Sequence, residues 1–435
     1  MGSTPKKERG SIIMENTRRY DIIVAGGGLT GVAAAISGAR EGCRVLLIEK
    51  SGFLGGAPCN CLVHPFMPYH RARDGQPPEP VNAGLFTVIL NRMAELGGLA
   101  PNRGAFREET MKLVLDRMCQ ENDVTVLLHT TLIGVSREGN RITSVETYGK
   151  SGRHQWQAEY FIDCTGDADL TYQAGCPTNL GRETDHQCQP MTLCFRMGNV
   201  DMEKWAKSSR DVNRLYREYQ ACGKIRNPRE DVLVPQPFFP MKGVVHFNTT
   251  RVVGRSPVQE EDLSTAEREA REQVQEMVAF LQEAVDGFQD AQLLMCAPEI
   301  GVRESRMIQG EYLLTAEDLL NCVKFPDSVA RGVYQIDIHS PDGSGTYLRQ
   351  IPKGDYYTIP YRSLIPKGME NLLAAGRCLS STHEAQSAYR VMPICCCIGE
   401  GAGTAAALAF KAGCRIQEVS YQAIHQQLDR YGAKY

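Results

Sequence analysis

The sequence lacks the features that would assign it to a membrane or to nucleic acid. No apolar run approaches the ~18 consecutive residues that a transmembrane helix needs, so we predict no membrane-spanning segment. The formal net charge of the 435 residues is only -3, which gives no global electrostatic basis for binding nucleic acid or an anionic membrane. Residues 1–18 are polar and lack the apolar stretch of a secretion signal, so we expect a disordered tail there. We therefore predict a cytoplasmic protein that acts on a small molecule.

The sixteen cysteines lack the Cys-x-x-Cys spacing that is typical of redox pairs and of many metal sites. The three adjacent cysteines at 395–397 cannot converge on one ion, because neighbouring side chains diverge on a helix or a strand. We therefore predict buried, reduced thiols and no metal site. Cys59 and Cys61 lie close together in the N-terminal part, which leaves a redox role for them open.

The strongest positive signal is a Gly-x-Gly-x-x-Gly motif at Gly26, Gly28 and Gly31. The apolar run 20–25 before it predicts a buried strand, and the alanine-rich segment 29–41 after it predicts a helix. The glycines permit a tight turn and a close backbone approach to a pyrophosphate, and the helix N-terminus offers N–H groups and a positive dipole end. Glu49 ends the next apolar strand, where its carboxylate can accept hydrogen bonds from a ribose. This order predicts a dinucleotide-binding site.

Features after Glu49 favour FAD over a nicotinamide dinucleotide. The glycine pair at 55–56 would let the backbone pass close to a flat or phosphorylated group. Strands predicted over 124–135, 141–148 and 155–162 form a β-meander that is typical of FAD-binding folds. We expect the glycine-rich segment 399–403 to open the last helix, 404–412, with its N-terminus toward the flavin. The predicted FAD-binding residues are Gly26, Gly28, Leu29, Thr30, Gly31, Glu49, Lys50, Gly55, Gly56, Ala57, Leu132, Thr165, Gly166, Asp167, Gly376, Arg377, Gly399, Glu400, Ala402 and Gly403.

The order of these elements predicts an α/β fold. We expect a doubly wound, Rossmann-type FAD-binding domain with a β-meander, interrupted by an α+β substrate or cap domain. The predicted boundaries place the FAD-binding domain at 19–179 and 361–435 and the cap domain at 180–360. The cap contains a predicted long helix over 264–288, which Ser264 and Glu267 would start as a capping box.

Further segments recur together in one family: 301–306, 334–339, 359–362 and 375–378, followed by His383 and Arg390. With the glycine motifs, they resemble FAD-dependent oxidoreductases of the glutathione-reductase-2 type, which are distantly related to fumarate reductase flavoproteins. The resemblance covers nearly all of residues 20–415 and implies the fold, FAD and redox chemistry, but not the substrate. The sequence departs from the family pattern at 57–59, and at Arg377, where other flavin reductases have an aspartate.

Hydride exchange with a flavin requires a proton donor or acceptor and an anchor for the substrate. His383 and Arg390 precede the predicted flavin-facing helix. We therefore predict that His383 moves a proton and that Arg390 holds a carboxylate or another oxyanion. The alternative is that both are structural or contact FAD itself.

Two further catalytic candidates come from the predicted cap. Asp337 and His339 alternate on a predicted strand and share one face, so His339 could exchange a proton while Asp337 orients it. Arg303 is a candidate anion-binding residue. The alternative is that Arg303 or Arg306 has a structural role and forms an ion pair with Glu304, which lies between them in the sequence.

The predicted function is an FAD-dependent oxidoreductase that transfers a hydride between flavin N5 and a small polar or anionic substrate. It would dehydrogenate a C–OH or C–C bond or run the reverse, enoate-type reduction; the alternative is an electron-transfer flavoprotein subunit of a larger redox complex. A flavin monooxygenase is disfavoured because Asp167 is not followed by the Ala-Ala-His usual in hydroxylases, and a tRNA-modifying flavoprotein because no basic patch is present. With one glycine motif, a reductase would take electrons from a redox partner protein or from NAD(P)H docked over the flavin.

Overall fold

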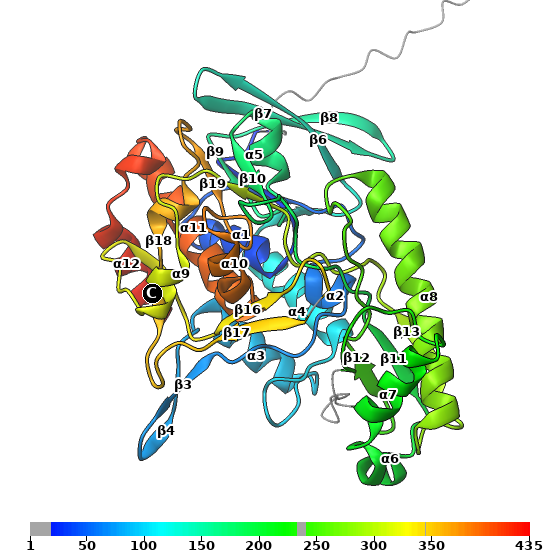
Figure 1. Ribbon diagram of the computed structural model, residues 1–435. Coiled ribbons are helices and arrows are strands. Elements are labelled where there is room, and N and C mark those ends of the chain that lie inside the picture. The colour runs from blue at the N-terminus through cyan, green and yellow to red at the C-terminus, as the bar shows by residue number, and fades with distance from the viewer. Residues whose placement is uncertain (1–18, 233–240, 344) are drawn as a thin grey trace, which may run out of the picture.

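The computed structural model describes residues 19–232, 241–343 and 345–435 (Figure 1). The tail predicted at 1–18 lies outside the described residues. A five-stranded parallel sheet forms the centre of the fold, in the order β19-β9-β1-β2-β5. Its strands are β1 (Ile22–Ala25), β2 (Val45–Ile48), β5 (Thr125–Leu127), β9 (Tyr160–Asp163) and β19 (Leu372–Ala374). All five carboxyl ends therefore lie at one edge of the sheet.

The two faces of this sheet are covered by different layers. On one face, Ile22 and Val24 pack in the largest apolar cluster with α1 (Leu29–Arg40), α3 (Leu85–Glu95) and α4 (Glu108–Glu121). On the other face, Ile23 and Ala25 pack against a meander of three antiparallel strands, β6 (Thr131–Glu138), β7 (Arg141–Gly149) and β8 (Gly152–Gln157). The meander was predicted, but the strands predicted over 124–135 and 155–162 are each divided between it and the parallel sheet. Successive residues of a strand point to opposite faces, and both faces are covered, so β1 and β2 are continuously apolar.

The last long helix differs from the sequence prediction. Helix α11 spans Met392–Ala412, so the prediction that residues 399–403 open a helix at 404 is wrong. A Cβ atom at Gly399 or Gly403 would overlap the carbonyl oxygens of Thr30 and Ala34, so these glycines allow α11 to pack closely on α1. Glycine disfavours a helix interior, which is why the segment resembles a turn, but this packing overrides the propensity.

Helix α11 is also long and apolar enough to cross a membrane, contrary to the expectation that no segment is. However, 89% of its most apolar window is buried inside the protein, and core helices of soluble proteins meet the same criterion. The burial accounts for its composition without a bilayer. The chain then ends with α12 (Tyr421–Arg430).

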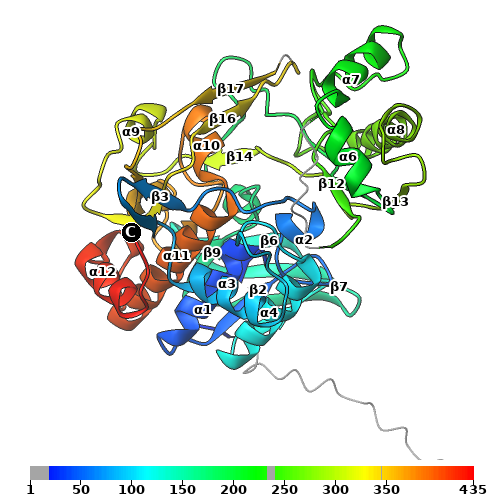
Figure 2. The same cartoon turned by 90° about the horizontal axis from the view of Figure 1, so that it is seen from below.

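A second apolar cluster lies beside the first one and is built mostly from residues 191–300. It contains the sheet β12-β11-β13, formed by β11 (Phe195–Gly198), β12 (Val245–Phe247) and β13 (Gln292–Cys296). Around it pack α6 (Met202–Ser208), α7 (Val212–Ala221) and α8 (Glu260–Ala284), which Figure 2 shows to one side of the parallel sheet. Helix α8 begins after Gln259, so Ser264 lies inside it and the predicted capping box is wrong.

The rest of the predicted cap segment packs with the first cluster instead. Leu314, Val329, Ile336 and Tyr357 are all buried there. The division of the chain at 180 and 360 stays a prediction. The remaining elements are α2 (Ala57–Asn60), β3 (His70–Arg73), β4 (Gln76–Pro80), α5 (Asp169–Gln173), β10 (Thr178–Leu180), β14 (Arg306–Ile308), α9 (Ala316–Leu320), β15 (Ser328–Gly332), β16 (Ile336–His339), β17 (Thr346–Arg349), β18 (Tyr357–Pro360), α10 (His383–Tyr389) and the 3₁₀ helices η1 (Tyr361–Leu364) and η2 (Ile416–Glu418).

Candidate functional site

The predicted glycine motif forms the turn between β1 and α1 at the carboxyl edge of the sheet. Gly26 has a φ of 98°, and a Cβ atom there would overlap the backbone of Cys164 at the end of β9. A Cβ atom at Gly31 would overlap the carbonyl oxygen of Gly26. Gly28 starts α1 without a side-chain cap, and the first turn of α1 carries no acidic residue. The N-terminus of α1 therefore keeps its positive dipole end for an anionic group such as a phosphate.

The second glycine pair lies directly on this turn. The N–H of Gly55 donates to the carbonyl oxygen of Gly27 at 2.9 Å. A Cβ atom at Gly56 would lie 2.8 Å from the Cα of Gly28, whereas one at Gly28 would have no neighbour closer than 3.8 Å. The backbone at Gly28 thus faces open space, which a bound group can occupy. We call the four segments 26–31, 55–57, 165–167 and 376–377 the cofactor cradle.

The carboxylate of Glu49 is held in place beside the cradle. Its Oε2 accepts from the N–H of Gly27 at 2.6 Å and its Oε1 accepts from the N–H of Ser51 at 2.7 Å. Each carboxylate oxygen has more than one lone pair, so Glu49 can still accept from the hydroxyls of a ribose. The geometry is compatible with the predicted role.

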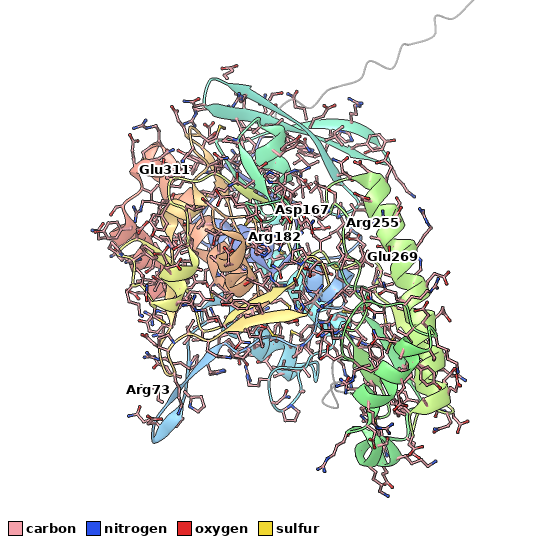
Figure 3. The ribbon with its side chains drawn as sticks, viewed as in Figure 1. Arg73, Asp167, Arg182, Arg255, Glu269 and Glu311 are labelled. Atoms are coloured by element: carbon pink, nitrogen blue, oxygen red, sulfur yellow. The ribbon has the colours of Figure 1, made fainter. Side chains whose placement is uncertain are left out.

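Arg377 joins two segments of the cradle to the second cluster. Its Nε donates to the carbonyl oxygen of Gly166 at 2.8 Å, its Nη2 to Asp167 Oδ1 at 2.5 Å and its Nη1 to the carbonyl oxygen of Val302 at 2.8 Å. Burial alone would raise the pKa of Asp167, but the adjacent guanidinium outweighs it and lowers this pKa. In the view of Figure 3, Asp167 lies between the meander and the β16–β17 hairpin. Arg377 therefore holds the turn after β9 against the segment that leads into the cavity.

Six predicted cofactor residues belong to none of the four cradle segments. Gly399, Glu400, Ala402 and Gly403 are inside α11, so they do not offer a helix N-terminus. The side chain of Lys50 is 63% exposed and lies 3.7 Å from Glu299. Leu132 lies on β6, packed against the cluster beneath the meander.

A cavity of about 760 Å³ adjoins the cradle. Ala57 and Arg377 form its border with the cradle. Val391 and Met392 also line the cavity, so the N-terminus of α11 lies at its wall. The remaining walls come from the second cluster and from β16 and β17. The helix terminus that we predicted at residue 404 therefore lies at this cavity, one residue after Arg390.

Three of the four predicted catalytic residues line this cavity, namely Arg303, His339 and Arg390. The fourth, His383, is not among its lining residues. Its Nδ1 instead lies 2.7 Å from Glu304 Oε1, with both side chains buried. The prediction that Glu304 pairs with an arginine is therefore wrong: it pairs with His383, and its Oε2 accepts from the N–H of Gln189 at 2.9 Å.

His339 and Asp337 lie on one face of β16, as predicted, with 3.8 Å between His339 Nε2 and Asp337 Oδ1. The Nδ1 of His339 is 3.1 Å from Arg251 Nη2, which has only protons to donate. We therefore assign the imidazole proton to Nε2, on the side of Asp337. Burial, followed by the charge of Arg303 and other arginines, lowers the pKa of His339 well below its ordinary value. His339 is a neutral imidazole at pH 7.

Arg303 and Arg390 differ in how many of their hydrogen-bond donors have a partner in the protein. Arg303 Nη1 donates to the carbonyl oxygen of Pro190 at 2.6 Å and to Thr192 Oγ1 at 2.7 Å. Burial, together with the nearby guanidinium of Arg390, lowers the pKa of Arg303 to about 9. Arg390 Nη2 has only long contacts of 3.3–3.4 Å, and its buried Nε has no hydrogen-bond partner among the described residues. Arg390 therefore has donors left for a ligand.

Several cavity residues were missed by the sequence analysis. Arg229, His246, Asn248 and Arg251 lie on or beside β12. Gln189 does not line the cavity, but it was missed as well: its buried side chain joins Arg390 to the backbone of β16. No spacing within the sequence marks them, because they come from a stretch without a motif and meet the other residues only through the tertiary fold.

The predicted cysteine alternative finds no support in the geometry. All sixteen cysteines are free. Cys59 and Cys61 contact the carbonyl oxygens of Glu108 and Ile300, respectively. Burial raises the pKa of both thiols, that of Cys61 to about 12, which disfavours the thiolate that redox chemistry needs.

Comparison with solved structures finds proteins of similar overall size. A geranylgeranyl bacteriochlorophyll reductase-like protein from Thermoplasma acidophilum is 13% identical, with a TM-score of 0.46 over 96% of this chain and 84% of that chain. The p-nitrophenol 4-monooxygenase from Pseudomonas putida is 10% identical, with a TM-score of 0.47 over 95% and 84%. Similarities at this level indicate neither the reaction nor the substrate. No curated protein matches the chain.

The comparison with protein families is decisive for the cofactor. One family model, described as FAD dependent oxidoreductase, matches residues 21–428. That range contains the whole cradle and the cavity. FAD is therefore the cofactor, and the glycine turns and the free N-terminus of α1 fit its pyrophosphate. The chain belongs to the family of FAD dependent oxidoreductases.

Proposed function

We propose that this enzyme transfers a hydride between FAD and a small polar or anionic substrate that binds in the arginine-lined cavity. The observation that carries this proposal is the position of the cavity. It borders the cradle at Ala57 and Arg377, and three predicted substrate-handling residues line it. A substrate there would be next to the redox-active end of a cofactor whose phosphates occupy the glycine turns.

The residues present fit FAD part by part. The N–H groups at the start of α1 would bind the pyrophosphate, and Glu49 would accept from the adenosine ribose. The N-terminus of α11 at Met392 would stabilise negative charge at the pyrimidine edge of the flavin. When bound, FAD supplies a site that accepts or donates a hydride.

The chain itself would supply binding and proton transfer. Arg390, with its unsatisfied Nε, and Arg303 would hold an oxyanion of the substrate. His339 is neutral and lines the cavity, so it can take a proton from a substrate hydroxyl or carbon or return one in the reverse reaction. His383 would act only indirectly, by fixing Glu304 and, through it, the backbone of Gln189.

The same cavity would also serve the second half-reaction. Because the sequence has one dinucleotide motif, we propose that electrons enter or leave through NAD(P)H docked in the cavity or through a redox partner protein. The large volume is compatible with a nicotinamide ring that replaces the substrate.

The test is anaerobic absorbance of the FAD-loaded protein during titration with alcohols, hydroxy acids and saturated acids, and separately with NADH and NADPH. Bleaching of the flavin band by a small metabolite without oxygen would support hydride transfer. The variant Arg390→Gln should then need at least ~10-fold more of an anionic metabolite, because a charge-assisted hydrogen bond is worth about 1.5–3 kcal/mol. The control is Arg268→Gln on the exposed side of α8. A flavin that dithionite reduces but none of these compounds does would contradict the proposal.

A further inference from the structure

Three arginines on the cavity wall have no acidic partner. Arg251, Arg303 and Arg390 contact only carbonyl, amide, hydroxyl or imidazole groups, and none of them forms an ion pair within the residues that the structure describes. The neighbouring Arg229 and Arg377 do have carboxylate partners, at 3.0 Å and 2.5 Å. A cation held away from water is costly without a counter-charge. The cavity lining also carries the carboxylates of Glu230, Asp231 and Asp337, but its six arginines outnumber them. The excess positive charge favours a ligand with more than one negative charge.

These three guanidinium groups lie at two places around one histidine. Arg251 Nη2 contacts the imidazole of His339 at 3.1 Å. Arg390 is linked to the backbone of His339 through Gln189. Its Nη2 lies 3.4 Å from Gln189 Oε1, and this oxygen also accepts from the backbone N–H of His339 at 3.2 Å. Arg303 lies near both of these arginines: burial, then the charge of Arg390 and, more weakly, the charges of Arg229 and Arg251 lower its pKa. One cation is thus on the ring side of His339 and one is toward the N-terminus of α11, and Arg303 lines the same cavity.

We propose that the ligand of this cavity is a small dicarboxylate, with one carboxylate bound by Arg251 and the other by Arg390 and Arg303. This inference rests on the proposed function, in which the substrate occupies the cavity. A carboxylate is a strong acceptor for guanidinium donors, so each end of the ligand gains a charge-assisted hydrogen bond. A compact anion such as phosphate would satisfy one of the two places and leave the other without a counter-charge.

The arrangement also gives His339 a defined task. In the structure its Nδ1 accepts from Arg251. A carboxylate that accepts from Arg251 Nη2 would remove this donor from the nitrogen. Nδ1 could then accept a proton from the carbon chain between the two carboxylates, once the rotatable hydroxyl of Thr346, whose Oγ1 lies 3.3 Å from Nδ1, points its proton elsewhere. Binding of the distal carboxylate would thereby switch on the proton acceptor, and a monocarboxylate bound only at Arg390 would not.

The inference is tested by binding, which needs no turnover. The FAD-loaded protein is titrated with malonate, succinate and glutarate, and with butyrate and inorganic phosphate as controls, followed by calorimetry and by the flavin difference spectrum. We expect one dicarboxylate to bind at least ~10-fold more tightly than butyrate, which has the four carbons of succinate but one charge. Equal binding of succinate and butyrate, or tighter binding of phosphate than of every dicarboxylate, would overturn the inference.

Two variants locate the carboxylates. Arg251→Gln and Arg390→Gln should each reduce the affinity for the preferred dicarboxylate by at least ~10-fold and leave butyrate binding in Arg251→Gln unchanged, whereas Arg268→Gln should have no effect. Unchanged dicarboxylate affinity in either cavity variant would overturn the assignment. Flavin content and melting temperature show whether a variant is folded, and the series of acids on the unaltered protein does not depend on the variants.

The two proposals fail in different ways. If monocarboxylates and neutral alcohols bleach the flavin while dicarboxylates neither bind nor react, hydride transfer stands and the dicarboxylate is wrong. If a dicarboxylate binds tightly at Arg251 and Arg390 but no metabolite bleaches the flavin, the binding site stands and the proposed reaction is wrong.

Discussion

The cofactor cradle and the arginine-lined cavity meet at Ala57 and Arg377, yet they are built in different ways. The cradle is made of backbone: its glycines pack against each other and against the carbonyl groups of neighbouring turns. The cavity is made of long side chains from segments far apart in the sequence, such as Arg251 and Arg390. The first region tolerates almost no added atom, whereas the second depends on charge and on which side chain reaches which partner. Mutations should therefore affect the two regions differently.

The largest effect is expected within the cradle. Gly31→Ala should abolish the folded, FAD-loaded protein, because its Cβ atom would overlap the carbonyl oxygen of Gly26. Gly28→Ala should leave the fold intact, since Gly28 has a φ of -67° and open space before it, but should weaken FAD binding roughly 10- to 100-fold by intruding on the cofactor. Flavin-to-protein absorbance ratios and thermal unfolding separate the two outcomes. Gly104→Ala, whose Cβ atom would have no neighbour closer than 3.7 Å and whose φ is outside the left-handed region, is the control that should retain FAD.

The second effect concerns the support of the cavity. Glu304→Ala should lower the free energy of unfolding by about 3–5 kcal/mol, because it leaves the buried imidazole of His383 and the N–H of Gln189 without their acceptor. Glu304→Gln keeps one acceptor oxygen and should recover part of the loss. Urea unfolding of the three proteins measures this. A change below ~1 kcal/mol in the alanine variant would mean that the pair does not support the cavity.

The third effect tests the helix that both regions share. Burial raises the pKa of Glu400 in α11 to about 7, from an ordinary value of 4.5. Between these pH values the folded protein holds a proton that the unfolded chain has released, so Glu400 destabilises the fold increasingly as pH rises from 4.5 to 7. Glu400→Gln can still accept from the N–H of Leu85 and does not titrate. Its stability relative to the unaltered protein should therefore increase by on the order of 3 kcal/mol between pH 4.5 and pH 8.

The measurement is urea unfolding at several pH values. Glu183→Gln, an exposed position, serves as the control and should follow the unaltered protein at each pH. Parallel stability curves for Glu400→Gln and the unaltered protein would show that the pKa of Glu400 is the same in the folded and the unfolded state, which would contradict the prediction.

The smallest effect lies between the two regions. The Lys50–Glu299 pair has 3.7 Å between its charged atoms and is largely exposed, so Lys50→Gln should change stability by less than ~1 kcal/mol. FAD affinity should change by less than ~3-fold, although the sequence analysis placed Lys50 among the cofactor residues. Fluorescence titration of the apoprotein with FAD is the measurement. A large loss of FAD affinity in Lys50→Gln would mean that Lys50 does contact the cofactor.

The sequence by itself determined the parts of this protein that depend on local backbone geometry and on short periods. A turn such as 26–31 needs glycine at fixed positions whatever surrounds it, so its motif predicted the strand, the helix and a dinucleotide site, in agreement with the FAD cofactor that the family match supports. The alternation of side chains along a strand likewise placed Asp337 and His339 on one face. These requirements act over a few residues and can be read from spacing alone.

Only the tertiary structure decided which distant groups meet. The start of α11 was misplaced because close packing of Gly399 on α1 outweighs the low helix propensity of glycine. Glu304 pairs with His383, 79 positions away in the sequence, and not with the arginines on either side of it. Arg251 lies in a stretch without a motif and enters the cavity because β12 packs on β11 beside the turn that follows β16. Electrostatic partners are chosen by distance and burial in the folded chain, and these quantities have no counterpart in residue spacing.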